Sequence, residues 1–539
     1  MALRLITGRS GQGKTEYLVQ EVIRLSMENP QQKYYVIVPE QFSLEMQRKM
    51  VKKHPRHGFF NIDVLSFHRL AYRIFDECGY QPGEILEDLG VSMMLRKILS
   101  EGENNFLYFK KSMKKAGFID ELKSMLMEFI GYGVTWEQVE EVSEKLGENK
   151  ALSNKCKELG RIYEHFDKAI EGRFMVTEQI LDVAREFAKE APMLTNAVFY
   201  FDGFAGFTPV QLAFLKELLK VAGQINVTIT IPEFVPGQRG MPEDLFTSSK
   251  KTGDALLMLC QENMQEVEEV VKLDTPVSPR FINNPELAFL EKNLFQNSRK
   301  IYSKKIERIH MTVCHNPDGE ADYVMHKIEQ LVRQKGYRYR DFAVLSGDVA
   351  DYASAFKRKA AILNIPVFED TKKKVSYHSG VEAVRSLFHL AQMEYSYESV
   401  FRYLKSGMSN LIDEDADYLE NYVLYAGVRG YSMWKKPFYR RLKNKDEAAI
   451  KALLLLQEKF MEETENFCSV MRDKEASVRD KIEVLYHTMV KLSFEEKLKN
   501  QAQKAEENSD FVKAAEYRQL YDLLLSLMDK IVMIFGEEK

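Results

Sequence analysis

GRSGQGKT, at residues 8–15, is the stretch that decides the fold. The apolar run ALRLIT precedes it at 2–7, and KTEYLVQEVIRLSM follows at 14–27 with its apolar residues at helical spacing. This order of strand, glycine-rich turn and amphipathic helix predicts a phosphate-binding loop that opens a parallel α/β sheet. Two further strand-like runs, YYVIVPE at 34–40 and NIDVLSF at 61–67, support a doubly wound core.

The eight residues fit the pattern G-x-x-x-x-G-K-[ST]. In such a loop, backbone N–H groups turn inward around phosphate oxygens beside a helix N-terminus that favours anions. We therefore expect Lys14 to reach the β- and γ-phosphates of ATP and Thr15 to hold Mg²⁺. A chance match on a glycine-rich turn is the alternative. The predicted nucleotide-binding residues are Gly8, Arg9, Ser10, Gly11, Gln12, Gly13, Lys14 and Thr15.

A phosphate-binding loop needs a second carboxylate on a neighbouring strand to complete its metal site. Asp202, which ends the apolar run NAVFYFD at 196–202, is the natural candidate for Mg²⁺. In hydrolysing motors of this architecture a glutamate that polarises the attacking water usually follows, but here the next residue is Gly203. We therefore expect nucleotide to be held and turned over slowly or not at all. A cap on the following loop is the alternative role for Asp202.

Ser66, Phe67, His68 and Arg69 follow the third predicted strand. A hydroxyl, an aromatic ring and basic groups suit single-stranded DNA, because the ring stacks on a base and the polar groups meet phosphate. The alternative is that Ser66 caps a helix and Phe67 belongs to the core. The segment PEQFS, at 39–43, holds the equivalent place after the second strand and is equally ambiguous.

The remaining chain alternates between helical and mixed stretches. Residues 85–195 are charged and helical with no convincing strand, whereas ERIHMTVCHN at 307–316 and DFAVLSGD at 341–348 read as strands. The predicted organisation is a first α/β domain over 1–84 and 196–300, a helical insertion over 85–195, the start of a second α/β domain over 301–376, and a helical domain over 377–539.

The composition of the chain bears on its location in the cell and on the roles of its cysteines, histidines and lysines. The net charge of −4 neither indicates nor excludes a nucleic-acid binder. The chain has no run of about 18 apolar residues, so we expect no membrane span and a cytoplasmic protein. Its five cysteines are scattered, which predicts reduced thiols and neither zinc nor iron–sulfur spacing. Packing, surface or loop roles are expected for His310, His315, Lys372-Lys373-Lys374 and the segment 401–405.

The order GRSGQGKT, VPEQFS, VLSFHRLAYRIF, helical insertion and FYFDGFAGFTPVQ resembles superfamily 1 helicases of the UvrD and RecB kind. VFRYLKSG at 400–407 and DYLENYVLYAG at 417–427 are similar to AddB subunits of the bacterial AddAB helicase–nuclease, and the resemblance extends over essentially the whole chain. It implies RecA-like domains 1A and 2A with helical insertions 1B and 2B, ATP with Mg²⁺, an AddA-type partner, and single- and double-stranded DNA ends processed for recombinational repair.

The resemblance also implies a degenerate helicase that scans single-stranded DNA while AddA drives movement. Gly203 agrees with this, as does Ser346-Gly347-Asp348, where active relatives tend to place an arginine. AddB subunits are much longer and end in a RecB-type nuclease domain whose cysteines hold a four-iron four-sulfur cluster. We therefore expect this chain, which ends at Lys539, to lack that domain and cluster and to be a truncated, split or fragmentary subunit.

Two other functions stay open at this point. One is a stand-alone ATPase or nucleotide kinase, against which the long helical insertions count. The other is a non-catalytic scaffold that binds DNA and a partner and keeps a vestigial phosphate loop. Gly203, in the place of a catalytic glutamate, favours the scaffold over the stand-alone enzyme.

Overall fold

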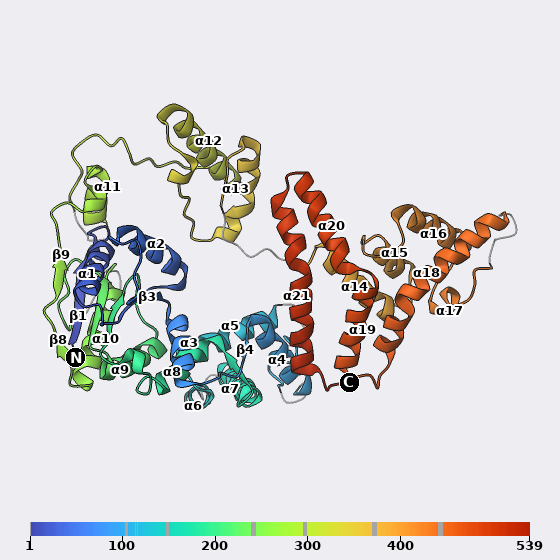
Figure 1. The fold of residues 1–539 in the computed structure, drawn as a ribbon, viewed down its shortest axis with the longest axis horizontal. Helices are drawn as coiled ribbons and strands as arrows, with labels where there is room; N and C mark the ends of the chain where they lie inside the picture. The colour runs from blue at the N-terminus through green and yellow to red at the C-terminus, as the bar shows by residue number, and fades with distance from the viewer. Residues whose placement is uncertain are drawn as a thin grey trace. The chain divides into compact units, whose positions relative to one another are not determined.

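The polypeptide separates after Thr312 into two units, Met1–Thr312 and Val313–Lys539 (Figure 1). Each unit is built around hydrophobic clusters of its own. The computed structural model describes residues 2–102, 106–113, 115, 117–146, 150–238, 244–294, 299–368, 375–439 and 446–539.

A parallel sheet forms the centre of the first unit. Within the described residues its strand order is β3-β2-β6-β7-β1-β8, and β9 also pairs with β1. All of these pairs are parallel, so the strands end at one shared carboxyl edge. The strands are β1 Ala2–Gly8, β2 Tyr34–Ile37, β3 Ile62–Leu65, β6 Val198–Phe201, β7 Gln224–Thr230, β8 Glu266–Val267 and β9 Val271–Leu273.

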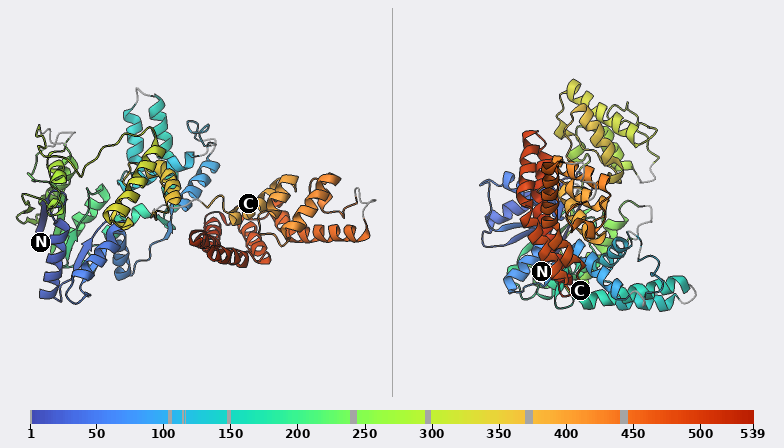
Figure 2. Two further views of the ribbon diagram at one scale, coloured as in Figure 1. Left: turned by 90° about the horizontal axis from the view of Figure 1, so that it is seen from above. Right: turned by 90° about the vertical axis from the view of Figure 1, so that its right-hand side faces the viewer.

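Helices cover both faces of this sheet (Figure 2). The apolar stripes of α1 (Lys14–Glu28) and α2 (Ser43–Lys53) pack on one face. The other face is covered by α3 Phe67–Cys78, α8 Ile180–Glu186, α9 Pro209–Val221 and α10 Thr247–Glu262. Because both faces are buried, the central strands are continuous apolar runs, which made them readable in the sequence. The predicted α/β, RecA-like parallel sheet is confirmed.

An insertion of helices leaves the sheet after α3 and returns before β6 (Figure 1). Its two ends carry short strands, β4 and β5, that pair in parallel and close a neck. The prediction that 85–195 contains no strand was therefore wrong, because three-residue strands are too short to show a period-two pattern. The elements are β4 Glu84–Leu86, α4 Asp88–Glu101, α5 Phe118–Gly131, α6 Trp136–Lys145, α7 Lys150–Ile170 and β5 Phe174–Val176.

Short 3₁₀ turns and one further helix complete the first unit. They lie where the chain leaves strands or passes between longer helices. Their bounds are η1 Glu40–Phe42, η2 Thr177–Gln179, η3 Pro192–Leu194, η4 Pro279–Phe281 and α11 Pro285–Asn293.

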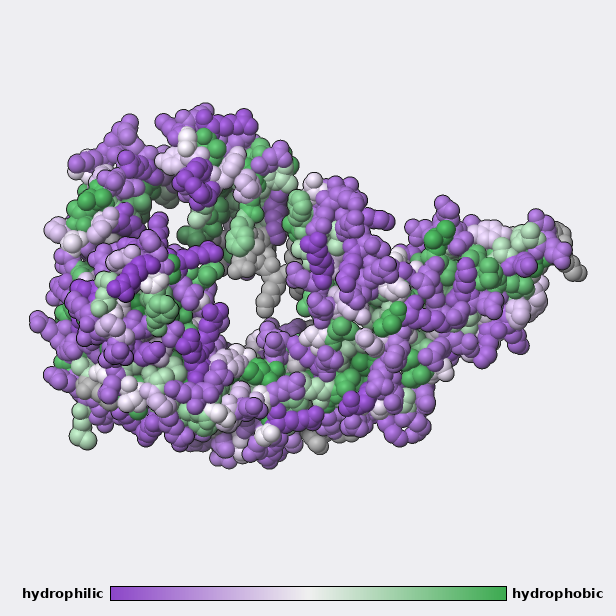
Figure 3. Space-filling view, viewed as in Figure 1, coloured by the Kyte–Doolittle hydropathy of each residue, from purple (hydrophilic) through white to green (hydrophobic). Residues whose placement is uncertain are grey.

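The second unit begins with α12 (Pro317–Lys335), the 3₁₀ turn η5 (Tyr339–Asp341) and α13 (Val349–Leu363). The strands predicted at 307–316 and 341–348 are absent, because residues 299–368 contain no strand at all. Strand-forming composition does not suffice where no neighbour supplies hydrogen bonds. Hydrophobic residues gather on the surface of this segment (Figure 3), and its Met311, Val313 and Leu345 are more than nine-tenths exposed, at 95%, 96% and 94%.

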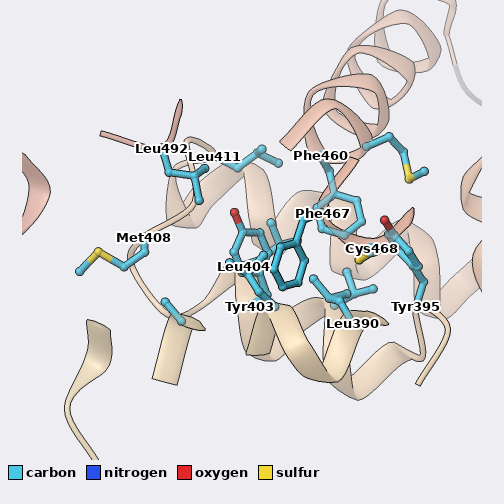
Figure 4. Packing of buried hydrophobic residues seen from close by; sticks show 14 of the residues in the cluster. Leu390, Tyr395, Tyr403, Leu404, Met408, Leu411, Phe460, Phe467, Cys468 and Leu492 are labelled. Atoms are coloured by element: carbon cyan, nitrogen blue, oxygen red, sulfur yellow. The ribbon is translucent and has the colours of Figure 1, made fainter. Parts of the chain in front are cut away.

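Helices alone make up the described part of 377–539, as predicted. Their common core includes Leu390, Tyr403, Phe460 and Phe467 (Figure 4). Segment 401–405 has the expected structural role, with Phe401, Tyr403 and Leu404 buried. The helices are α14 Ser379–Gln392, α15 Tyr397–Leu404, α16 Asp413–Ala426, α17 Tyr431–Trp434, α18 Glu447–Arg472, α19 Val478–Lys491, α20 Phe494–Glu507 and α21 Phe511–Phe535.

The remaining expectations concern lysines, membrane spans and thiols. Lys372, Lys373 and Lys374 lie outside the described residues. Among the helices that are described, none is long and apolar enough to cross a membrane. All five cysteines are free thiols.

Candidate nucleotide-binding site

The loop between β1 and α1 takes its shape from two glycines. Gly11 and Gly13 have φ of 78° and 90°, a left-handed conformation that only glycine adopts easily. Gly13 caps α1 without any side-chain hydrogen bond to the first turn, so the first N–H groups of this helix remain open to an anion. The loop therefore has the backbone geometry that phosphate binding requires.

Lys14 is folded back onto this loop. Its Nζ donates hydrogen bonds to the carbonyl oxygens of Gly8 (2.8 Å) and Arg9 (3.1 Å). Burial lowers the pKa of Lys14 to about 8, although the negative charge of Asp202 opposes the change. The ammonium group thus lies at the mouth of the loop, where burial destabilises its charged form. An anionic ligand would stabilise that charged form.

Thr15 and Asp202 meet although 187 residues separate them in sequence. Thr15 Oγ1 donates to Asp202 Oδ2 at 2.7 Å, and Thr228 Oγ1 donates to Asp202 Oδ1 at 2.6 Å. Asp202 is 5% exposed, at the carboxyl end of β6. A hydroxyl and a carboxylate oxygen are hard ligands that suit Mg²⁺, whose remaining positions are usually filled by phosphate and water. Asp202 is the one carboxylate in this pair, and the described residues contain no group of three His, Cys, Asp or Glu side chains that could hold a metal ion.

The residue after Asp202 carries no carboxylate. Gly203 is exposed and has a φ of 82°. Its conformation turns the chain away from β6 and disfavours any side chain at this position. The site therefore has groups that could hold phosphate and metal, but the position after Asp202, where a catalytic glutamate was expected in a hydrolysing motor, is a glycine.

A segment far along the chain covers the loop, and the sequence did not reveal it. Gln12 is buried and exchanges hydrogen bonds with the backbone N–H and carbonyl of Thr275, both at 3.1 Å, and accepts one from its hydroxyl at 2.6 Å. A Cβ on Gly11 would lie only 2.6 Å from Ser278 Oγ. Residues 275–280 thus pack over the loop and hydrogen-bond to it. Their structure could not be predicted from the sequence, because they show no periodic pattern.

Arg280 is a cation of the site that sequence reasoning missed. Its Nη1 donates to Ser10 Oγ at 3.4 Å, and its charge contributes to the lowered pKa of Lys14. Arg9 of the loop is paired with α11, because its Nε lies 3.5 Å from Glu291 Oε1 and its Nη2 donates to the carbonyl of Lys292. Arg280 and Lys14 therefore bring two positive charges to the loop, and the carboxylates of Asp202 and Glu291 act on Lys14 with the opposite sign. An arginine in an irregular loop carries no local signal that would have identified it.

The segment predicted to contact DNA is only partly available. Ser66 accepts a hydrogen bond from the N–H of Arg69 and caps α3. Phe67 is 6% exposed and packs against Phe201 and Phe204, so its ring is not free to stack on a base. This corrects the stacking role expected for Phe67, since the structure follows the capping alternative. His68 and Arg69 remain at the surface of the carboxyl edge.

A parallel sheet with helices on both faces and a large helical insertion defines an α/β protein with a RecA-like core. The family described as "ADDB, N-terminal" matches residues 5–291, and the chain belongs to that family.

Curated relatives agree with this assignment. A protein of Lachnoclostridium phytofermentans is 32% identical over 544 residues, one of Thermoanaerobacter sp. (strain X514) is 32% identical over 547, and one of Caldanaerobacter subterraneus subsp. tengcongensis is 31% identical over 553. Each is named as the B subunit of an ATP-dependent helicase/deoxyribonuclease. The alignments cover 100% of this chain and 47% of each relative, so the chain spans about half their length.

Proposed function

We propose that this chain is the ATP-binding, helicase-like part of an AddB subunit. The observation that carries the proposal is the convergence of Lys14, Thr15 and Asp202 at one carboxyl edge, beneath a loop whose amides are open to phosphate. The names of the relatives support ATP dependence and action on DNA. The proposed complex pairs the chain with an AddA-type subunit in the cytoplasm, where it processes double-strand DNA ends for repair.

Nucleotide binding would rearrange only a few side chains. Lys14 exchanges the carbonyls of Gly8 and Arg9 for phosphate oxygens, which stabilise its charged form. Thr15 and Asp202 supply oxygen ligands to Mg²⁺, and Arg280 faces the phosphates from the segment that covers the loop. Each of these groups already lies at the loop, so the site needs little reorganisation to accept ATP.

Turnover is proposed to be slow, since Gly203 provides no base to orient the attacking water. The same observation supports the second candidate, a scaffold that binds DNA and a partner and uses ATP for structure alone. Both candidates share the phosphate site and differ only in hydrolysis. In either case single-stranded DNA would run along the carboxyl edge, near His68 and Arg69.

Binding of a fluorescent ATP analogue with Mg²⁺ tests the phosphate site. Wild-type protein should bind it, and Lys14→Ala should not, because the variant removes the ammonium that meets the phosphates. Lys33→Ala is the matched control, since Lys33 precedes β2 at the opposite edge of the sheet. Equal binding by wild type and Lys14→Ala would overturn the proposed site.

Steady-state hydrolysis with and without single-stranded DNA then separates the two candidates. A DNA-stimulated rate well above background would reject the scaffold. Tight nucleotide binding with no turnover would reject a motor and retain the scaffold.

A further inference from the structure

The surface of α2 that faces away from the sheet carries apolar and basic side chains together. Leu44, Arg48, Val51 and Lys52 are all exposed. They recur at intervals of three and four residues, which places them on one face of the helix. Leu44 and Val51 are 56% and 38% exposed. The opposite face of α2 already supplies its contacts with the core, so this outer face is not needed to hold the helix on the sheet.

The outer face of α2 forms one wall of a groove of about 470 Å³. The other wall is Gly58 and Phe59, which precede β3 and therefore lie toward the amino edge of the sheet, away from the phosphate-binding loop. Phe59 packs edge to face against the buried ring of His54, with 6.2 Å between centroids. His54 Nδ1 in turn accepts a hydrogen bond from the N–H of Arg56 at 3.2 Å. The groove is thus formed without a ligand, which reduces the entropy lost on binding.

The groove is basic, although the chain as a whole is not. Residues 44–60 contain five lysines and arginines and one acidic residue, Glu45, which does not line the groove. The two other lysines of α2 pair with Glu16 on α1, whereas Arg48 and Lys52 line the groove and form no ion pair with any described residue. Such a lining is complementary in charge to a ligand that presents carboxylates or phosphates.

The apolar part of the lining favours a polypeptide over a nucleic acid. Nucleic acids are held by cations that meet phosphates and by aromatic rings that stack on bases. The exposed surfaces of Leu44 and Val51 are aliphatic and offer neither contact. A peptide can place a leucine or phenylalanine against them, as anchor residues do in the grooves that recognise peptides.

We propose that this groove binds an acidic peptide segment of another protein. An apolar side chain of that segment lies against Val51 and Phe59, and carboxylates on either side of it pair with Arg48 and Lys52. The buried apolar anchor supplies most of the affinity, whereas the exposed ion pairs set the rate of association and its dependence on salt. The proposal is independent of nucleotide binding, because none of these residues belongs to the phosphate-binding loop.

Fluorescence anisotropy on the full chain measures the two parts of this contact separately. The probe is a fluorescein-labelled peptide in which one leucine and one phenylalanine are flanked by aspartates. Val51→Asp should weaken its binding roughly tenfold or more, because a carboxylate replaces the apolar contact and repels the peptide. Lys52→Glu should weaken binding about tenfold at 0.1 M salt and much less at 1 M salt, where charges are screened within about 3 Å.

Matched variants and peptides control for general effects. Val142 is a 48% exposed valine on α6, and Lys157 is an exposed lysine on α7 that forms no ion pair with any described residue. Val142→Asp and Lys157→Glu should bind the probe like wild type. A peptide with serines in place of its leucine and phenylalanine, or with lysines in place of its aspartates, should not bind. An unchanged midpoint in chemical denaturation verifies that each variant is folded.

Hydrogen exchange with mass spectrometry locates the peptide on the unaltered chain. Bound peptide should slow exchange within residues 44–60. Failure of the wild type to bind the probe, or binding that Val51→Asp and Lys52→Glu leave unchanged, would overturn the proposal. Two other occupants are tested with the same variants, by anisotropy of a fluorescein-labelled oligothymidine and by sedimentation of the chain alone. Loss of oligothymidine binding or of a dimer in Val51→Asp, with no effect on the peptide, would assign the groove to DNA or to a second copy instead.

Discussion

Lys14 should make nucleotide affinity depend on pH. Burial has lowered its pKa to about 8, and a triphosphate would raise that pKa again because it favours the ammonium form. Binding therefore takes up protons, and affinity should fall as pH rises above about 8, well above the pKa of about 6 of a phosphate group. Titrations of the ATP analogue across this range would measure the slope.

Lys14→Arg provides the control for this pH dependence. A guanidinium stays charged throughout the range, so the variant should bind with an affinity that does not change with pH. An equal slope in the variant and in wild type would assign the titration to another group.

Asp202 is expected to account for the magnesium dependence of binding. Asp202→Asn keeps the shape and can still bond Thr15 and Thr228, but it removes the charge that attracts the cation. Affinity for the ATP analogue should then be nearly the same with Mg²⁺ and with EDTA. Asp63→Asn, on β3 and paired with Arg73, should retain the wild-type dependence on Mg²⁺.

The sequence predicts those residues of the site whose chemistry is local. Lys14 lies within a compact pattern, and Asp202 ends a run that only a buried strand explains. Arg280 could not be found this way, because nothing near it in sequence shows that it reaches Ser10. Phe67 was ambiguous for another reason, since a serine followed by an aromatic residue is equally suited to a helix cap.

At the scale of elements, the turn after β6 depends on glycine. Gly203 has a φ of 82°, and a Cβ there would lie 3.5 Å from Pro39, an ordinary contact distance. The destabilisation caused by a side chain at this position would therefore come from the backbone conformation and not from a steric clash. Gly203→Ala should lower the free energy of unfolding by about 1–2 kcal/mol. Chemical denaturation measures it, with Gly58→Ala as the control because Gly58 is neither left-handed nor crowded. Equal losses in the two variants would contradict this explanation.

Residues 275–280, which cover the phosphate-binding loop, should be held less tightly when Gln12 of that loop is replaced. Gln12→Ala removes three hydrogen bonds to Thr275, and the backbone of 275–281 should then exchange hydrogen faster. Hydrogen exchange with mass spectrometry would show the change. Gln20→Ala, which loses only an exposed contact with Glu16 on α1, should leave that segment as it is in wild type.

Strands were predictable from the sequence where the strand that pairs with them lies within the described chain. The apolar runs of β2 and β6 pair with each other, so composition and outcome agree. The runs at 307–316 and 341–348 have equally suitable residues, but neither pairs as a strand with any described segment, and most of their side chains are exposed. Whether a segment forms a strand depends on a neighbouring strand that pairs with it, and the residues of the segment alone do not show whether that neighbour is present.

At the scale of the whole molecule, the candidate nucleotide site belongs to one unit. All of its groups, from Gly8 to Lys292, lie within Met1–Thr312, which has hydrophobic clusters of its own. A chain ending at Thr312 should therefore fold and bind the ATP analogue with the affinity of the full chain. Isothermal titration of both proteins tests this, and a large loss in the shorter one would show that Val313–Lys539 supports the site.

The pairing of β4 with β5 makes the helical insertion structurally independent of the main sheet. Leu86 and Val176 are paired residues, so the two ends of the insertion stay together whatever lies between them. Helices can be lengthened, lost or replaced beyond this point without shifting a strand that carries the nucleotide site. The insertion can therefore differ in length and sequence among relatives of this chain while the strands and the loop of the candidate nucleotide site keep their places.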